Sequence, residues 1–133
     1  MKVISTIKSI ISADIETVWK VVTSLDDYAW RSDIVRIERL HDGSFMEYTA
    51  DGIATRFIVT SFEPCSCYEF DLENENLQGH WTGRFRQTAH GTEIMFTETI
   101  MVKRWWLIPM VKLFLKKQQK RYVADLKRKC QYH

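Results

Sequence analysis

The chain has 133 residues, of which 45% are hydrophobic and 27% charged, with a net charge of +2. This length suits one domain with a real core, and the composition excludes a disordered or low-complexity chain. No apolar run approaches the roughly 20 residues needed to span a bilayer, and the first residues lack the apolar block of a signal peptide. We therefore expect a single cytoplasmic domain over residues 1–133, with its three cysteines reduced.

Charge is unevenly distributed along the chain. Residues 103–133 hold ten Lys or Arg and one acid, Asp125, whereas residues 1–102 carry a net charge of −7. Such asymmetry is typical of nucleic-acid or anionic-membrane contacts, but also of the solvated face of a helix. Because there is no zinc-finger spacing, aromatic RNP pattern or obvious helix-turn-helix, we expect no nucleic-acid partner.

The N-terminal part of the chain predicts a strand followed by a helix. Residues 2–11 alternate between two rows, which is strand periodicity. Ser12 or Asp14 can then cap a helix over about 14–24, in which apolar residues recur at helical spacing. Residues 25–30 predict a short second helix or a tight turn.

The middle of the chain predicts a series of hairpins. Asp42-Gly43 and Asp51-Gly52 are strong turn signals, because both positions tolerate positive φ. Pro64 ends one strand, since proline cannot donate to a strand ladder. Six further strands are expected, over residues 33–40, 45–50, 53–62, 67–72, 79–88 and 92–102.

The C-terminal part changes to helical periodicity. From Leu107 to about residue 130 the apolar residues follow a helical stripe, and Pro109 suits the first turn. Lysines repeat every four residues on another face. The order of elements predicts an α+β fold, in which a curved antiparallel sheet of seven strands wraps around this long C-terminal helix. A cavity between sheet and helix is an expectation of that architecture.

Several stretches resemble the SRPBCC superfamily, also called START-like or helix-grip. Residues 11–19 are similar to its first strand and helix, with Asp14 where members often have proline. The Tyr28-to-Trp30 stretch, the Gly91-Thr92 turn and a long helix from Trp105 fit the same pattern. The resemblance covers nearly the whole chain and implies a hydrophobic cavity between sheet and helix. Members bind or transport lipids, sterols, quinones or polyketide-like molecules, and some are cyclases or dehydratases; the fold does not decide among these.

One carboxylate breaks an otherwise apolar row. Glu98 shares a face of the last strand with Ile94, Phe96, Ile100 and Val102. If that row faces the cavity, Glu98 is desolvated and its pKa rises, which suits an acid, a base or a ligand anchor. A Glu at the sheet rim, held by a structural partner, is the alternative.

Other candidates for ligand contact come from the aromatic rows. Trp81 and Phe85 share one face with Gly83 between them, so either core packing or stacking on a ligand is expected. Arg56 shares a row with Ile58 and could pair with Glu98 or face outward. The full set of expected ligand-binding residues is Trp30, Tyr48, Arg56, Tyr68, Trp81, Phe85, Phe96, Glu98, Met110 and Phe114.

The sequence does not decide among three possible functions. The first is binding or transport of a small hydrophobic ligand without chemistry, and the second is a cyclase or dehydratase that uses Glu98. The third is weak contact with an anionic membrane or a protein, through Trp105, Trp106 and the basic helix face. We expect no metal and no cofactor, because suitable ligand spacing and phosphate-binding loops are missing.

Overall fold

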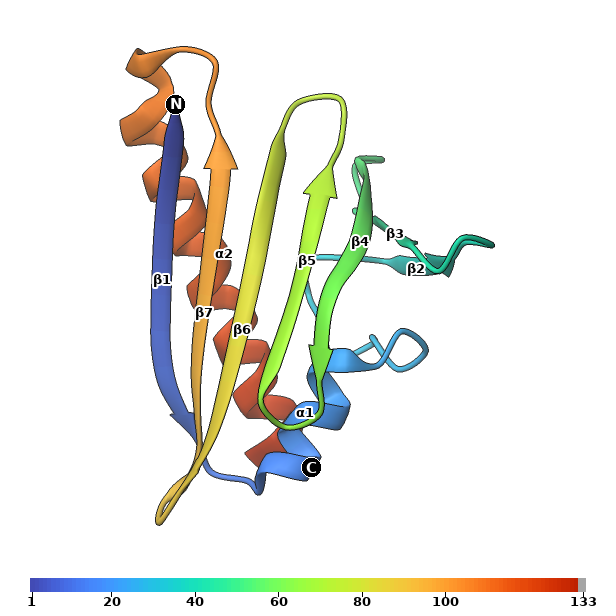
Figure 1. Ribbon diagram of the computed structural model, residues 1–133, viewed down its shortest axis with the longest axis vertical. Coiled ribbons are helices and arrows are strands. Elements are labelled where there is room, and N and C mark those ends of the chain that lie inside the picture. Colours follow the sequence, from blue (N-terminus) through green and yellow to red (C-terminus); the bar gives the residue numbers. More distant parts are fainter. Residues whose placement is uncertain (132–133) are drawn as a thin grey trace.

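The computed structural model describes residues 1–131 as one curved sheet with two helices (Figure 1). The elements in chain order are β1 (Lys2–Ile11), α1 (Ile15–Thr23), β2 (Arg36–Arg39), β3 (Phe45–Tyr48), β4 (Ala54–Glu63), β5 (Cys67–Glu73), β6 (Gln78–Thr88), β7 (Gly91–Met101), a 3₁₀ turn (Trp105–Leu107) and α2 (Ile108–Gln131).

All seven strands form one antiparallel sheet in the order β1-β7-β6-β5-β4-β3-β2. Strands β2 to β7 form a meander, whereas β1 pairs with β7 at the far edge. Helix α2 covers the concave side, and α1 fills one end between sheet and α2 (Figure 1). The predicted α+β helix-grip architecture is confirmed.

Helix α1 begins where the sequence predicts it. The Asp14 carboxylate accepts a hydrogen bond of 2.7 Å from the backbone N–H of Thr17, which is an N-terminal cap. After the helix, residues 25–30 form bends and turns and no helix, so the tight-turn alternative is correct. Ser24 Oγ accepts the Asp27 N–H there at 3.0 Å.

The turn before β7 requires glycine. Gly91 has a φ of +131°, and a Cβ at that position would collide with the Ile11 carbonyl oxygen. The predicted Asp-Gly turns are also present, although β2 and β3 are shorter than the sequence suggests.

A bulge in β4 changes which residues face the helix. The pairing with β5 shifts between Val59 and Ser61, so residues on either side of the bulge follow different alternation. Phe57 and Phe62, five residues apart, therefore both reach the aromatic residues of β5. Arg56 lies on the opposite, outer face of the sheet, because its strand neighbour Phe57 faces inward.

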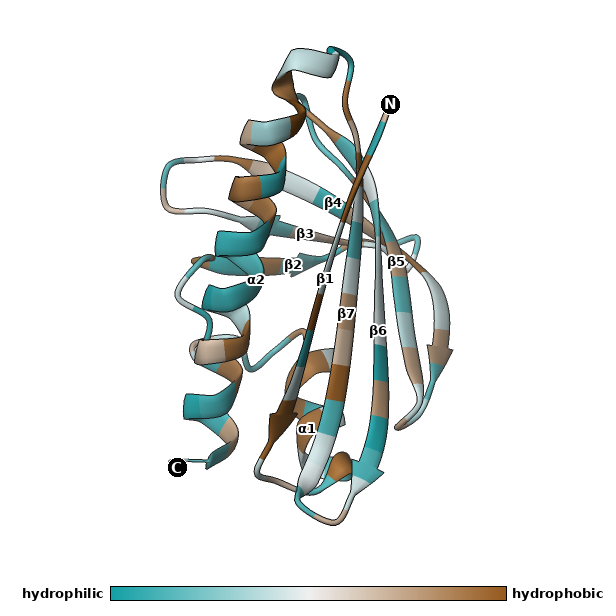
Figure 2. Ribbon diagram, turned by 90° about the vertical axis from the view of Figure 1, so that its left-hand side faces the viewer, coloured by the Kyte–Doolittle hydropathy of each residue, from teal (hydrophilic) through white to brown (hydrophobic). Residues whose placement is uncertain are grey.

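Helix α2 is fastened to the β1 edge of the sheet. The buried Gln119 side chain donates to the Ser5 carbonyl at 2.8 Å and accepts from the Ser5 hydroxyl at 2.7 Å. One hydrophobic cluster surrounds α1 and the C-terminal half of α2, and a second lies near the N-terminal half of α2. Figure 2 shows α2 running along one face of the sheet. In residues 1–131, no helix is both long and apolar enough to cross a membrane.

Candidate functional site

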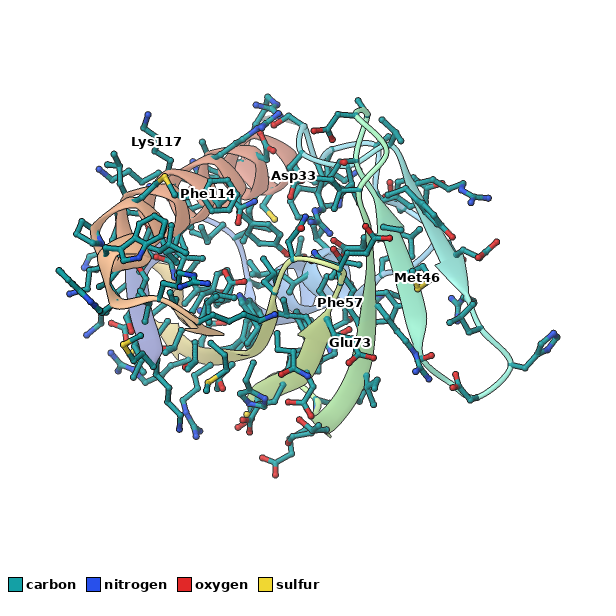
Figure 3. All side chains as sticks on the ribbon, turned by 90° about the horizontal axis from the view of Figure 1, so that it is seen from above. Asp33, Met46, Phe57, Glu73, Phe114 and Lys117 are labelled. Atoms are coloured by element: carbon teal, nitrogen blue, oxygen red, sulfur yellow. The ribbon has the colours of Figure 1, made fainter. Side chains whose placement is uncertain are left out.

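A cavity of 370 Å³ lies between the concave face of the sheet and α2. We call it the inner cavity. Its floor comes from β4 to β7, its roof from α2, and one side from residues 31–34. In Figure 3 Phe57 and Phe114 mark the sheet and helix sides. This volume falls in the range that small-molecule sites occupy.

Aromatic rings form the floor of the inner cavity. Phe70 and Trp81 stack with their centroids 4.9 Å apart, and Phe57 meets Phe70 edge-on at 5.0 Å. Tyr68 and Phe96 extend this surface. Burial raises the pKa of the Tyr68 hydroxyl to about 12, so it stays a neutral hydrogen-bonding group. The floor therefore offers flat apolar area with a few uncharged polar atoms.

Glu98 faces this apolar surface without a partner. The side chain lines the inner cavity from β7, and among residues 1–131 no hydrogen bond or ion pair engages its carboxyl group. Burial, together with the negative charge of Glu47, raises the pKa of Glu98 to about 7. The group can therefore be either neutral or charged near neutral pH.

A buried arginine forms the polar side of the cavity. Arg31 is bidentate to Glu47, at 2.7 and 3.1 Å, and bidentate to Asp33, at 3.1 and 2.8 Å. Burial opposes its charge, but the two carboxylates outweigh that effect and raise the pKa of Arg31. Its guanidinium also lies 5.2 Å from the Tyr122 ring centroid. With Glu98 ionised, the residues that line the cavity include three carboxylates and one cation, so the cavity disfavours an anionic ligand.

The segment that carries Arg31 is fixed to α2. Buried Asp125 accepts hydrogen bonds from the backbone N–H and the hydroxyl of Ser32, at 2.8 and 2.7 Å. Burial alone would raise the pKa of Asp125, but these bonds and Arg128 lower it. The single acid of the basic C-terminal segment therefore holds one wall of the cavity in place.

A second hollow of 770 Å³, the outer cavity, adjoins the first. It lies between the start of α2, the end of β7 and the loop after β5. Both hollows share the following lining residues: Asn74, Asn76, Leu77, Glu98, Phe114 and Gln118. Because Phe114 and Gln118 are exposed, the inner cavity opens toward solvent at this junction.

Half of the expected ligand-contact residues line these hollows. They are Tyr68, Trp81, Phe96, Glu98 and Phe114. Whether they bind a ligand stays a prediction.

Two of the others are core residues. Trp30 packs on Tyr122 at 5.4 Å, and Phe85 packs on Trp19 at 5.0 Å, away from the cavity. Both are aromatic and buried, and sequence alone does not separate them from the residues of the cavity floor.

The last three lie outside the site. Tyr48 faces outward, with its hydroxyl 3.1 Å from Glu38, because Glu47 takes the inward position next to it. Arg56 pairs with Asp42 on the outer face and does not meet Glu98. Met110 is 62% exposed, because it lies on a different side of α2 from Val111 and Leu115, which pack against the core.

Gly83 makes room for an indole ring. A Cβ there would collide with the six-membered ring of Trp81 and press on Phe96. The space beside Gly83 is therefore filled by Trp81 itself, which leans along the sheet and widens the cavity floor.

The sequence did not lead us to the polar side of the cavity, which Arg31, Asp33 and Glu47 form. Arg31 and Asp33 lie in an irregular segment, and charged residues in such segments are usually exposed to solvent. Glu47, however, has a recognisable pattern: it shares a face of β3 with Phe45, just as Glu98 shares a face of β7 with Phe96. An isolated acid in an apolar row identifies both.

Comparisons with known proteins agree with this architecture. A family model described as polyketide cyclase/dehydrase and lipid transport matches residues 2–131. A START superfamily protein from Mycobacterium smegmatis superposes with a TM-score of 0.80 at 15% identity, over 97% of this chain and 96% of that chain. A protein from Mesorhizobium loti gives 0.76 at 13%, over 94% of both chains.

A two-domain protein is also similar. The di-domain ARO/CYC protein BexL, from the BE-7585A biosynthetic pathway, gives a TM-score of 0.77 at 12% identity, over 99% of this chain and 51% of that chain. At such identities the likeness concerns the fold. A comparison with curated protein sequences finds no match.

Proposed function

Because the chain belongs to the polyketide cyclase/dehydrase and lipid transport family of the SRPBCC superfamily, we propose that it binds a small hydrophobic molecule in the inner cavity. The observation that carries this proposal is an aromatic cavity of 370 Å³ that side chains leave unfilled. Burying apolar ligand surface there yields about 25 cal/mol for each Å² removed from water.

The polar groups of the cavity narrow the ligand class. Phe57, Phe70 and Trp81 suit a flat or branched apolar body. Glu98 and Tyr68 offer hydrogen bonds to polar groups of a ligand, and the net negative charge of Arg31, Asp33 and Glu47 together disfavours a carboxylate or phosphate inside the cavity. The ligand we propose is therefore uncharged, with a carbonyl or hydroxyl group that reaches Glu98.

A titration with the uncharged fluorescent probe Nile red tests this function. The variant Gln118→Trp places an indole at the junction of the two cavities, where the native side chain makes no hydrogen bond in residues 1–131. The matched control Ala124→Trp adds the same indole to an exposed position of α2. We expect Gln118→Trp to weaken binding by about tenfold or more and the control to leave it unchanged.

Two results would overturn the proposal. One is the absence of Nile red binding to the native protein. The other is equal binding by both variants, because the probe would then sit outside the cavity. A Trp105→Ala/Trp106→Ala variant, with the cavity intact, identifies binding at exposed apolar surface instead.

A second candidate function rests on Glu98. An unpaired carboxyl group with a pKa near 7 can both accept and donate a proton at neutral pH. In a dehydration its carboxylate would take the proton from a carbon next to a carbonyl. The same proton would then go to the hydroxyl that leaves as water. Glu98→Gln preserves the shape and removes this transfer, so unchanged turnover in that variant would exclude Glu98 as the acid and base.

A further inference from the structure

The 3₁₀ turn before α2 and the start of α2 expose large apolar side chains. Trp105 is 72% exposed, Trp106 59%, Met110 62%, Leu113 60% and Phe114 52%. Trp106, Met110 and Leu113 are three or four residues apart and follow one side of the helix. We call these five residues the apolar tip. Isolated exposed apolar residues are normal on a protein surface, but five within ten positions form a patch that indicates contact with a partner.

The apolar tip is not the part of the helix that covers the sheet. Leu107, Val111 and Leu115 face the molecule, and Leu115 is buried in the core. The inward-facing residues and the row formed by Trp106, Met110 and Leu113 lie on different sides of the helix. The same segment can therefore pack against the protein and present apolar surface to solvent. Figure 2 shows hydrophobic positions recurring along this first half of α2.

The charges around the apolar tip have a single sign. Residues 101–117 contain five Lys or Arg and no acid. One of them, Lys116, donates to the Thr6 carbonyl at 2.6 Å, and Lys103, Arg104, Lys112 and Lys117 are exposed. Indole rings beside cations are the composition that favours the interface of an anionic bilayer.

The apolar tip also borders the entrance of the site. Leu107, Val111 and Phe114 line the outer cavity, which joins the inner cavity at Glu98. A surface that contacts the apolar tip would therefore face the opening through which a ligand enters.

We propose that the apolar tip docks on an anionic lipid bilayer with the cavity entrance facing the membrane. A second copy of this chain fits less well as the occupant, because pairing two apolar tips would bring two sets of cations together without an acid between them. An anionic bilayer satisfies both the apolar and the basic side chains.

Vesicle co-sedimentation tests the proposal. The probes are vesicles of phosphatidylcholine alone and of phosphatidylcholine with an equal amount of phosphatidylglycerol, at low and high NaCl. We expect binding to the anionic vesicles that weakens with salt. Trp105→Ala/Trp106→Ala should weaken binding by about tenfold or more, since both indoles lose contact with the interface.

A charge-reversed pair separates electrostatics from folding. Lys112→Glu/Lys117→Glu should weaken binding by more than about tenfold. The control Lys20→Glu/Arg84→Glu makes the same change of net charge away from the apolar tip, at exposed residues of α1 and β6, and should still bind. Circular dichroism confirms that each variant is folded.

Three outcomes would overturn the proposal. The first is no binding to anionic vesicles even at low salt, and the second is equal loss of binding in the control pair. The third is a dimer that the Trp variant dissociates, without vesicle binding by the native protein. None of these outcomes depends on whether the inner cavity binds Nile red.

Discussion

Trp81 and Glu98 are direct register partners on the adjacent strands β6 and β7, and both side chains line the inner cavity. The indole stacks on Phe70, while the carboxyl group faces apolar surface without a hydrogen bond in residues 1–131. This pairing places an ionisable group where water solvates it poorly, which is why its pKa rises.

The first prediction is that Glu98→Gln stabilises the protein at high pH. In the unfolded chain the carboxyl ionises near 4.5, but in the folded protein it ionises near 7. The loss of unfolding free energy caused by the buried charge is thus absent below pH 4.5, grows between pH 4.5 and 7, and is complete above pH 7. We expect the variant to gain about 3 kcal/mol above pH 7 and almost nothing at low pH.

Urea unfolding of both proteins across this pH range measures the difference. A gain of the same size at every pH would contradict the assignment, because a packing effect does not titrate.

The second prediction concerns the buried charge cluster. Arg31→Met should destabilise the protein by about 3–5 kcal/mol, because Glu47 and Asp33 lose their shared cation. Removing Glu47 as well, in Arg31→Met/Glu47→Met, should restore part of that loss. A double-mutant cycle measured by urea unfolding gives the coupling. Additive effects of the two substitutions would show that the pair does not interact.

The third prediction concerns the anchor of the segment that carries Arg31. Asp125→Ala leaves the Ser32 N–H without its acceptor, so we expect a loss of about 2 kcal/mol in unfolding free energy. The affinity for Nile red should fall as well, since Arg31 and Asp33 are then less well placed.

The control for this anchor is Asp27→Ala, which removes an exposed carboxylate that pairs with Lys129. Asp27→Ala should cost less than about 1 kcal/mol of unfolding free energy.

The stabilisation by Asp125 depends on pH. Because hydrogen bonds lower the pKa of Asp125, its contribution to stability is present above pH 3.8 and disappears as the pH falls through the pKa of the folded protein. An unchanged Nile red affinity in Asp125→Ala would contradict the link to the cavity.

The fourth prediction concerns the space under Trp81. Gly83→Ala puts a methyl group where the indole lies, so Trp81 must move and the cavity floor must change. We expect a loss of about 1–3 kcal/mol and an altered near-ultraviolet circular dichroism signal. Adding Trp81→Leu should make the alanine substitution nearly harmless. If Gly83→Ala costs as much in that background, the clash is not with Trp81.

Much of the fold follows from local rules. Alternation in residues 2–11 and 92–102, the Asp-Gly turns and the Asp14 cap each depend on neighbours in the sequence, and each matches the structure. The row containing Glu98 is also predictable, since one strand without a bulge keeps a constant alternation.

The remaining differences arise from features without a local signal. The bulge in β4 reverses the alternation, so the orientation of Arg56 cannot be inferred by counting. Arg31 enters the cavity because Ser32 bonds to Asp125, a contact across 93 positions of sequence. Met110 belongs to the apolar pattern of α2, but that pattern is too broad to show which of its residues face the sheet and which face solvent.

Native mass spectrometry of freshly purified protein shows whether the inner cavity holds a ligand. We expect a bound apolar species that survives gentle ionisation and that organic extraction recovers. Gln118→Trp should lose this species, and Ala124→Trp should retain it. If the native protein carries no such species and takes up no Nile red, or if both variants retain the same load, ligand binding in the inner cavity is contradicted.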